Sequence, residues 1–174
     1  MLLEGSCHCG AVRFSVRSQH PAPYQRCYCT VCRKTQGGGG YAINLGADAR
    51  TLKVHGRDHI RLYHAEIRNP EDERAHTSSA DRAFCGECGS ALWLFSPEWP
   101  ELIHPFASVI DTDLPVPPQH THLMLEFKAS WVEPAVRPLD KSFDRYPEES
   151  IADWHARTGT EAPDITSRSS SARR

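Results

Sequence analysis

The chain has 174 residues, of which 39% are hydrophobic and 24% are charged, and its formal net charge is −2. These values are typical of one globular domain, and they exclude disorder along the whole chain. The near-neutral charge gives no electrostatic footprint for nucleic acid, so we expect no such partner. No apolar run approaches the roughly 18 residues of a membrane span, and the N-terminus lacks the stretches typical of a signal peptide. We therefore expect a cytoplasmic protein without membrane contact.

Short strands separated by loops are predicted along most of the chain. Val12, Phe14 and Val16 alternate with polar residues, which is the two-residue period of a half-buried strand. Further strand-like segments lie at 41–45, 51–56, 59–64, 83–95, 102–110 and 120–127. The segment 66–81 is polar and predicts a surface loop or a solvated hairpin. The fold class is therefore mainly β.

The C-terminal part differs from the rest of the chain. Residues 148–159, EESIADWHARTG, place Ile151 and Trp154 on one helical face, and Gly159 is a typical helix stop. From residue 160 onward, small and polar residues predict a disordered tail. We therefore divide the chain into one domain of short strands (1–147), a C-terminal helix (148–159) and a tail (160–174).

Seven cysteines fall into close groups. They are Cys7 and Cys9, then Cys27, Cys29 and Cys32, then Cys85 and Cys88. A reducing compartment argues against disulfides, and an odd number of thiols would leave one unpaired. Spacings of two and three residues are unfavourable for disulfides but suit metal ligands, so the sequence predicts metal binding.

The cysteines can be assigned to two sites. Residues i and i+2 of an extended segment point the same way, so Cys7 and Cys9 can face one metal. The simplest assignment joins the first and last pairs in a closed four-thiolate site. It leaves Cys27, Cys29 and Cys32, here called the triplet, as a second site with three protein ligands. Another pairing, such as Cys7 and Cys9 with Cys27 and Cys29, remains open from spacing alone.

Several other residues are candidates around the triplet. Arg33 and Lys34 follow its last cysteine and could neutralise thiolates or contact a substrate carboxylate. One of His104, His120 and His122 could complete the coordination of the triplet metal, although an ordinary hydrogen-bonded histidine is commoner.

A run of four glycines follows the triplet at 37–40. Gly39 could allow a substrate to approach the backbone closely, but a plain flexible turn is the favoured interpretation. The run lacks the Lys-Ser/Thr ending of a phosphate loop, which argues against nucleotide binding. We assign Trp93, Phe95 and Trp131 to the core.

Four segments together resemble a known family. GSCHCGAVRF, CYCTVCRK, AFCGECGSALW and PPQHTHLMLEFKASWVEP resemble the glutathione-dependent formaldehyde-activating enzyme family, which also includes the centromere protein V domain. The resemblance runs from about residue 5 to residue 131 and implies a β-tent of small antiparallel sheets with two zinc ions. It implies a structural zinc on the first and last cysteine pairs and a catalytic zinc on the triplet. Two features depart from the family pattern: Tyr28 stands where histidine is common, and the polar loop at 66–81 is long.

The resemblance also implies an activity. The family reaction joins glutathione to formaldehyde and gives S-hydroxymethylglutathione, so we expect a zinc-dependent carbon–sulfur lyase with glutathione as co-substrate. Arg33, Lys34 and Gly39 are then candidate contacts for the thiol substrate. Two alternatives remain at this stage: an enzyme of the same fold with another thiol or aldehyde, and a two-zinc interaction module without catalysis.

Overall fold

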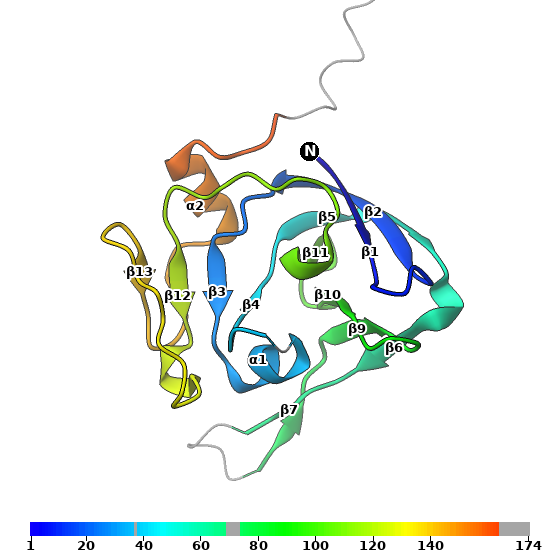
Figure 1. Ribbon diagram of the computed structural model, residues 1–174, viewed down its shortest axis with the longest axis horizontal. Helices are drawn as coiled ribbons and strands as arrows, with labels where there is room; N and C mark the ends of the chain where they lie inside the picture. The colour runs from blue at the N-terminus through cyan, green and yellow to red at the C-terminus, as the bar shows by residue number, and fades with distance from the viewer. Residues whose placement is uncertain (37, 69–73, 164–174) are drawn as a thin grey trace, which may run out of the picture.

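Two β-sheets of unequal size make up most of the structure, and two short α-helices lie at their margins (Figure 1). The computed structural model describes residues 1–36, 38–68 and 74–163. Most of the expected tail, the centre of the polar loop and the first glycine of the run lie outside the described residues. The predicted fold class, mainly β, is confirmed.

The larger sheet has seven strands in the spatial order β1-β2-β5-β11-β10-β9-β6, and every neighbouring pair is antiparallel. Its strands are β1 (Leu2–Ser6), β2 (Arg13–His20), β5 (Gly46–His55), β6 (Ile60–Tyr63), β9 (Asp81–Cys85), β10 (Ala91–Phe95) and β11 (Leu102–Pro105). The first cysteine pair follows β1 and the last pair begins at the end of β9, before β10, and the two turns approach each other so that the sulfurs of Cys9 and Cys85 are 3.8 Å apart.

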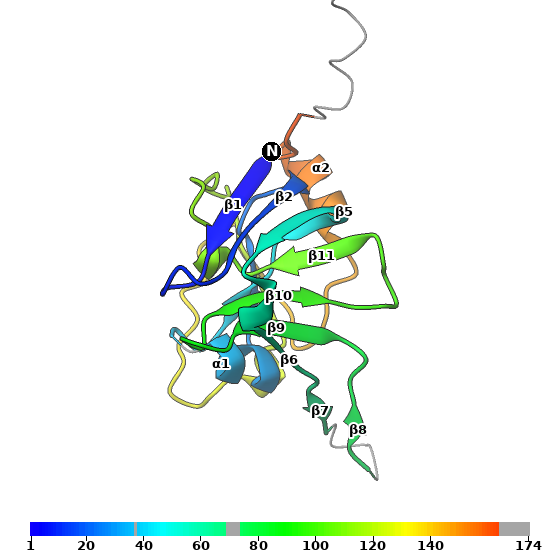
Figure 2. The same ribbon diagram turned by 90° about the vertical axis from the view of Figure 1, so that its right-hand side faces the viewer.

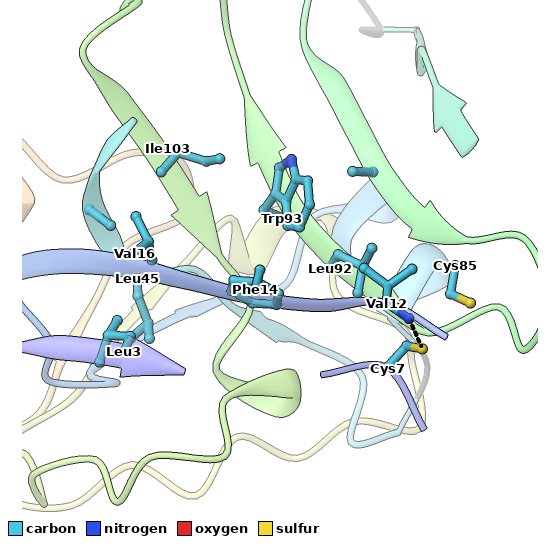
Figure 3. Packing of buried hydrophobic residues seen from close by; sticks show 12 residues of the cluster. Leu3, Cys7, Val12, Phe14, Val16, Leu45, Cys85, Leu92, Trp93 and Ile103 are labelled. Atoms are coloured by element: carbon cyan, nitrogen blue, oxygen red, sulfur yellow. Dashed lines mark hydrogen bonds between the residues drawn. The ribbon is translucent and has the colours of Figure 1, made fainter. Parts of the chain in front are cut away.

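One face of the larger sheet forms the main core. Val12, Phe14 and Val16 are buried, as their alternation with polar residues predicts. The Phe14 ring packs edge-on against Trp93, with 5.2 Å between the ring centroids (Figure 3). Cys7 and Cys85 belong to the same buried cluster, so one cysteine group lies directly at the edge of the core.

The smaller sheet has four strands in the order β13-β12-β3-β4. Its strands are β3 (Gln25–Cys27), β4 (Ala42–Ile43), β12 (Thr121–Leu123) and β13 (Lys141–Ser142). β12 runs parallel to both β3 and β13, whereas β3 and β4 pair antiparallel like the strands of the larger sheet. Long connections join these strands, so their direction is set by the surrounding fold, and alternation within a strand carries no signal for it.

The remaining elements are short. β7 (Glu66–Ile67) and β8 (His76–Thr77) pair antiparallel, which agrees with the hairpin interpretation of the polar segment (Figure 2). A helix not expected from the sequence, α1 (Thr30–Gln36), follows the second triplet cysteine. Seven residues give too few turns for a clear helical period, and such a helix depends on tertiary contacts. In the described ranges, 3₁₀ turns span Arg57–His59, Ala107–Val109 and Leu125–Phe127.

The predicted C-terminal helix is present as α2 (Ile151–Thr158). The Ser150 side chain caps its first turn by accepting from the Asp153 N–H, and Gly159 ends it with a φ of 65°. Trp154 is fully buried and stacks on Tyr24, with ring centroids 3.7 Å apart. The helix therefore docks through its aromatic face on the segment just before β3.

The three aromatic residues assigned to the core differ in how far they are exposed. Trp131, which we assigned to the core, is 68% exposed, because it follows the last 3₁₀ turn on a segment without regular pairing. Trp93 is buried and Phe95 is half-buried. Within the ranges that the structure describes, no helix is long and apolar enough to cross a membrane.

Candidate metal centres

The first cysteine group, the quartet, comprises Cys7, Cys9, Cys85 and Cys88. Its first pair lies in the turn that joins β1 to β2, and its second pair begins at the end of β9 and continues into the turn toward β10. Gly10 and Gly89 adopt φ values of 77° and 73°, a conformation that glycine tolerates best, so both turns can wrap closely around the sulfurs. All four sulfurs lie within 4.8 Å of one another.

Distances in the quartet suit a tetrahedral metal. The sulfur atoms of Cys7 and Cys9 are 3.5 Å apart, and those of Cys9 and Cys85 are 3.8 Å apart. A zinc–sulfur distance of about 2.3 Å gives a tetrahedral edge of about 3.8 Å. The Val12 N–H donates to the Cys7 sulfur at 3.2 Å, which favours a thiolate there. This cluster could therefore bind zinc.

Cys88 and Cys9 are the two exposed members of the quartet. A hydrogen bond with the Ser90 hydroxyl, 3.2 Å from the Cys88 sulfur, lowers the pKa of the Cys88 thiol to about 5. This hydrogen bond favours the Cys88 thiolate, which is the form that binds a metal.

The second group, the triplet, comprises Cys27, Cys29 and Cys32, and its sulfurs also lie within 4.8 Å of one another. Cys27 ends β3, and Cys32 lies in the first turn of α1, so the strand-to-helix turn gathers the three side chains. The Cys32 N–H donates to the Cys29 sulfur at 3.3 Å. Among the described His, Cys, Asp and Glu side chains, none joins this group as a fourth ligand.

Three thiols this close together in the triplet favour binding of a cation. Hydrogen bonding with Cys27 and then Cys32 lowers the pKa of Cys29 to about 2, while contact with Cys29 and Cys32 raises the pKa of Cys27. Three adjacent thiols cannot all ionise unless a cation offsets their charges. Thiolate sulfur is the donor that soft and borderline metals prefer, so the donor set fits zinc.

Arg82 lies next to the triplet, and sequence reasoning missed it. Its Nη2 atom is 3.7 Å from the Cys32 sulfur, and its buried Nη1 atom has no hydrogen-bond partner among the described residues. Residues 83 and 85 of β9 are buried on one face, and Arg82 projects from the other. The alternation of side chains in β9 could have placed Arg82 and Cys85 on opposite faces of the strand. The local sequence did not indicate that the face with Arg82 lies next to the triplet.

The other candidate contacts lie around α1. Arg33 is half-buried, and its buried Nε atom has no hydrogen-bond partner within the part of the chain that the structure describes, whereas Lys34 is exposed. Gly39 is exposed, and a side chain there would meet the Tyr41 ring at 3.2 Å. Gly40 is buried with a φ of 83°, and a side chain at this position would overlap Val132. The turn is therefore shaped by packing at Gly40.

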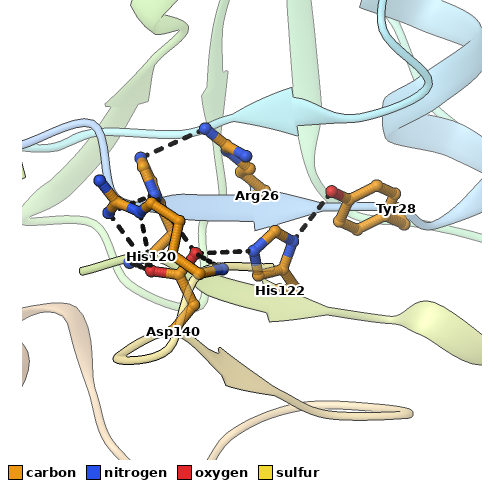
Figure 4. Close-up of polar contacts among 6 residues, drawn as sticks. Arg26, Tyr28, His120, His122 and Asp140 are labelled. Atoms are coloured by element: carbon orange, nitrogen blue, oxygen red, sulfur yellow. Dashed lines mark hydrogen bonds and ion pairs between the residues drawn. The ribbon is translucent and has the colours of Figure 1, made fainter. Parts of the chain in front are cut away.

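The three histidines considered as a fourth ligand have other partners. His104 Nδ1 lies 3.0 Å from the Leu45 carbonyl. The His120 ring lies between two guanidinium groups, with Nδ1 2.7 Å from Arg137 and Nε2 3.3 Å from Arg26. His122 lies between Asp140 and Tyr28 (Figure 4).

Comparisons with known proteins agree with the cysteine pattern. The family model for the glutathione-dependent formaldehyde-activating enzyme matches residues 2–126, which include all seven cysteines. A Halomonas elongata protein with the name "Putative glutathione-dependent formaldehyde-activating enzyme" is 62% identical over 161 residues, covering 92% of this chain and 99% of its own. A crystal structure of a Rhodobacter sphaeroides protein matches with 28% identity and a TM-score of 0.49, covering 64% of this chain and 91% of that one. The chain therefore belongs to the glutathione-dependent formaldehyde-activating enzyme family.

Proposed function

We propose that this chain is a zinc-dependent carbon–sulfur lyase that forms or cleaves an adduct of glutathione and formaldehyde, of the S-hydroxymethylglutathione type. The observation that carries the proposal is the contrast between the two cysteine groups: four sulfurs in the quartet and three in the triplet. Four protein ligands are typical of a structural zinc, and three leave one position for a substrate or water. A reducing, cytoplasmic setting would keep all seven thiols available as ligands.

The triplet would hold the catalytic zinc, and the quartet would hold the structural one. Zinc on three cysteines would supply an open position for the substrate sulfur and favour its thiolate form. Three thiolates would leave that site with a net charge of −1, so the adjacent Arg82 guanidinium would restore neutrality. Arg33, with its unpartnered buried N–H, and Lys34 are the proposed contacts for the carboxylates of glutathione, and Gly39 is a proposed backbone contact.

The proposed reaction needs few groups from the protein. The glutathione thiol gives its proton to water, its sulfur forms a bond to the aldehyde carbon as the carbonyl π electron pair moves to oxygen, and the oxygen takes a proton back from water, so that no proton is gained or lost overall. Cleavage of the adduct reverses these steps. Positioning of thiol and aldehyde would account for most of the acceleration, because little acid–base chemistry is required.

X-ray absorption at the zinc edge, with and without glutathione, tests this proposal. If the thiol enters the open position, the mean sulfur count should rise by about half a sulfur per zinc, because one of the two sites gains a ligand at about 2.3 Å. NMR exchange measurements on a formaldehyde–glutathione mixture should show faster exchange with the protein than without it. Cys29→Ser should lose both effects. An unchanged sulfur count together with unaccelerated exchange would refute the glutathione reaction.

A further inference from the structure

A buried chain of polar side chains connects the triplet turn to the segment after β12 (Figure 4). Tyr28, between the first two triplet cysteines, lies with its hydroxyl oxygen 3.0 Å from His122 Nδ1. His122 Nε2 lies 3.4 Å from a carboxylate oxygen of Asp140. The side chains of His122 and Asp140 are fully buried, and Tyr28 is 1% exposed. Water therefore does not compete for these contacts.

Asp140 is held as a carboxylate. Its oxygens accept from the His120 backbone N–H at 2.6 Å and from the Arg137 backbone N–H at 2.9 Å. The Arg137 guanidinium adds further contacts at 3.3 Å. Burial alone would raise the pKa of Asp140, but these hydrogen bonds hold the pKa well below its usual value. Each of these hydrogen-bonding groups donates to Asp140, as a carboxylate requires.

The charge of Asp140 determines which atom donates in each hydrogen bond between Asp140, His122 and Tyr28. A carboxylate only accepts hydrogen bonds, so His122 Nε2 must carry the hydrogen. Burial lowers the pKa of His122, so the ring is neutral and Nδ1 is an acceptor. The Tyr28 hydroxyl therefore donates to Nδ1. One tautomer of His122 satisfies both neighbours.

Backbone contacts extend this arrangement to the cysteines. The Tyr28 N–H donates to the Leu123 carbonyl at 3.0 Å, and Cys27 pairs with Leu123 in the β3–β12 register. Tyr28 is thus attached to β12 by its backbone and, through His122, by its side chain. Any rotation of the backbone at residue 28 would redirect the sulfurs on both sides of it.

We propose that Asp140, acting through His122 and Tyr28, positions Cys27 and Cys29 for metal binding. Asp140 lies beyond residues 2–126, the range of the family match, so the following segment of this chain supplies the anchor. The inference rests on the proposed function only in requiring that the triplet binds a metal. It does not depend on which thiol or aldehyde reacts.

Tyr28→Phe removes one hydroxyl and tests the role directly. In cadmium-substituted protein, the NMR signal of the triplet metal should shift or broaden while the quartet signal stays unchanged. The affinity of the triplet for zinc should fall about 10–100-fold, the usual effect of losing an outer hydrogen bond that orients a ligand. Tyr41→Phe is the matched control, since its ring lies 5.3 Å from that of Tyr28. Equal triplet affinity in both variants would overturn the proposal.

Asp140→Asn tests the direction of the hydrogen bonds that His122 makes. In the wild-type protein, NMR of isotopically labelled histidine should show the hydrogen of His122 on Nε2. An asparagine can present an N–H instead, and we expect a shift toward the Nδ1–H tautomer. A wild-type Nδ1–H tautomer would contradict the inference. If the Asp140 variant fails to fold, the Tyr28 comparison still decides. Loss of glutathione binding alone would count against the proposed function and leave this inference intact.

Discussion

Arg82 is the nearest cation to the triplet among the contacts described. Its guanidinium approaches the Cys32 sulfur at 3.7 Å from a strand whose other face carries Cys85. A positive charge at this distance favours thiolate over thiol, and metal binding requires the thiolate. One residue therefore links the charge balance of the triplet to the sheet that holds the quartet.

Replacing Arg82 with glutamine should weaken zinc at the triplet and leave the quartet unchanged. A hydrogen bond to a charged group contributes about 1.5–3 kcal/mol, so we expect at least a tenfold loss of triplet affinity. Competition with a graded chelator series, read as zinc released per chain, measures the change. Arg82→Lys keeps the charge and should retain more of the affinity. Identical release curves for wild type and Arg82→Gln would show that the cation does not stabilise the site.

The helix α2 depends on a neutral histidine. His155 is fully buried, and its Nε2 atom accepts from the Ala22 N–H at 3.1 Å while its Nδ1 atom donates to the Ile151 carbonyl at 2.7 Å. A protonated ring could not accept from Ala22. Desolvation lowers the pKa of His155, as it does that of the neighbouring His20.

Acid should therefore undock α2. The undocked histidine has a pKa of about 6.5 and takes up a proton more readily than the docked one, so the contribution of His155 is complete above that pH. It decreases as the pH falls below about 6.5 and is lost once the pH passes the lower, docked value. Near-UV circular dichroism of the stacked Tyr24 and Trp154 rings should weaken over this range. His155→Gln should show a flatter pH dependence, and a signal equally pH-dependent in both proteins would assign the transition to other groups.

The accuracy of sequence reasoning differed between elements for physical reasons. The alternation in β2 and the residues that cap α2 are local sequence features, so both elements could be predicted. α1 is too short to show a period, and the parallel direction of β12 depends on partners that are distant in sequence. The same holds at the triplet, where Arg82 and the Asp140 chain reach the site from distant segments. Cysteine spacing indicated ligands, but local spacing has no information on the side chains that surround them.

At the scale of the whole molecule, the two cysteine groups differ in what they connect. The quartet joins the β1–β2 turn to the β9–β10 turn, and Cys9 and Cys85 are separated by 76 residues. Closing such a loop costs about 4 kcal/mol, whereas a structural zinc contributes about 10–16 kcal/mol. The triplet spans only residues 27–32 and closes no long loop. The quartet metal should therefore dominate stability.

Cys88→Ser tests this difference. Cys88 is exposed, so the substitution removes little packing, and a large loss of stability has to come from the metal. We expect the variant to bind one zinc ion fewer and to unfold at a much lower temperature, measured by elemental analysis and by calorimetry. Cys29→Ser is the matched control: it should also lose one zinc ion but with a smaller fall in Tm, because no long loop is released. The quartet metal would not be the main stabiliser of the larger sheet if Cys88→Ser retained both metals and the wild-type Tm. An equal fall in Tm for Cys88→Ser and Cys29→Ser would also contradict this role.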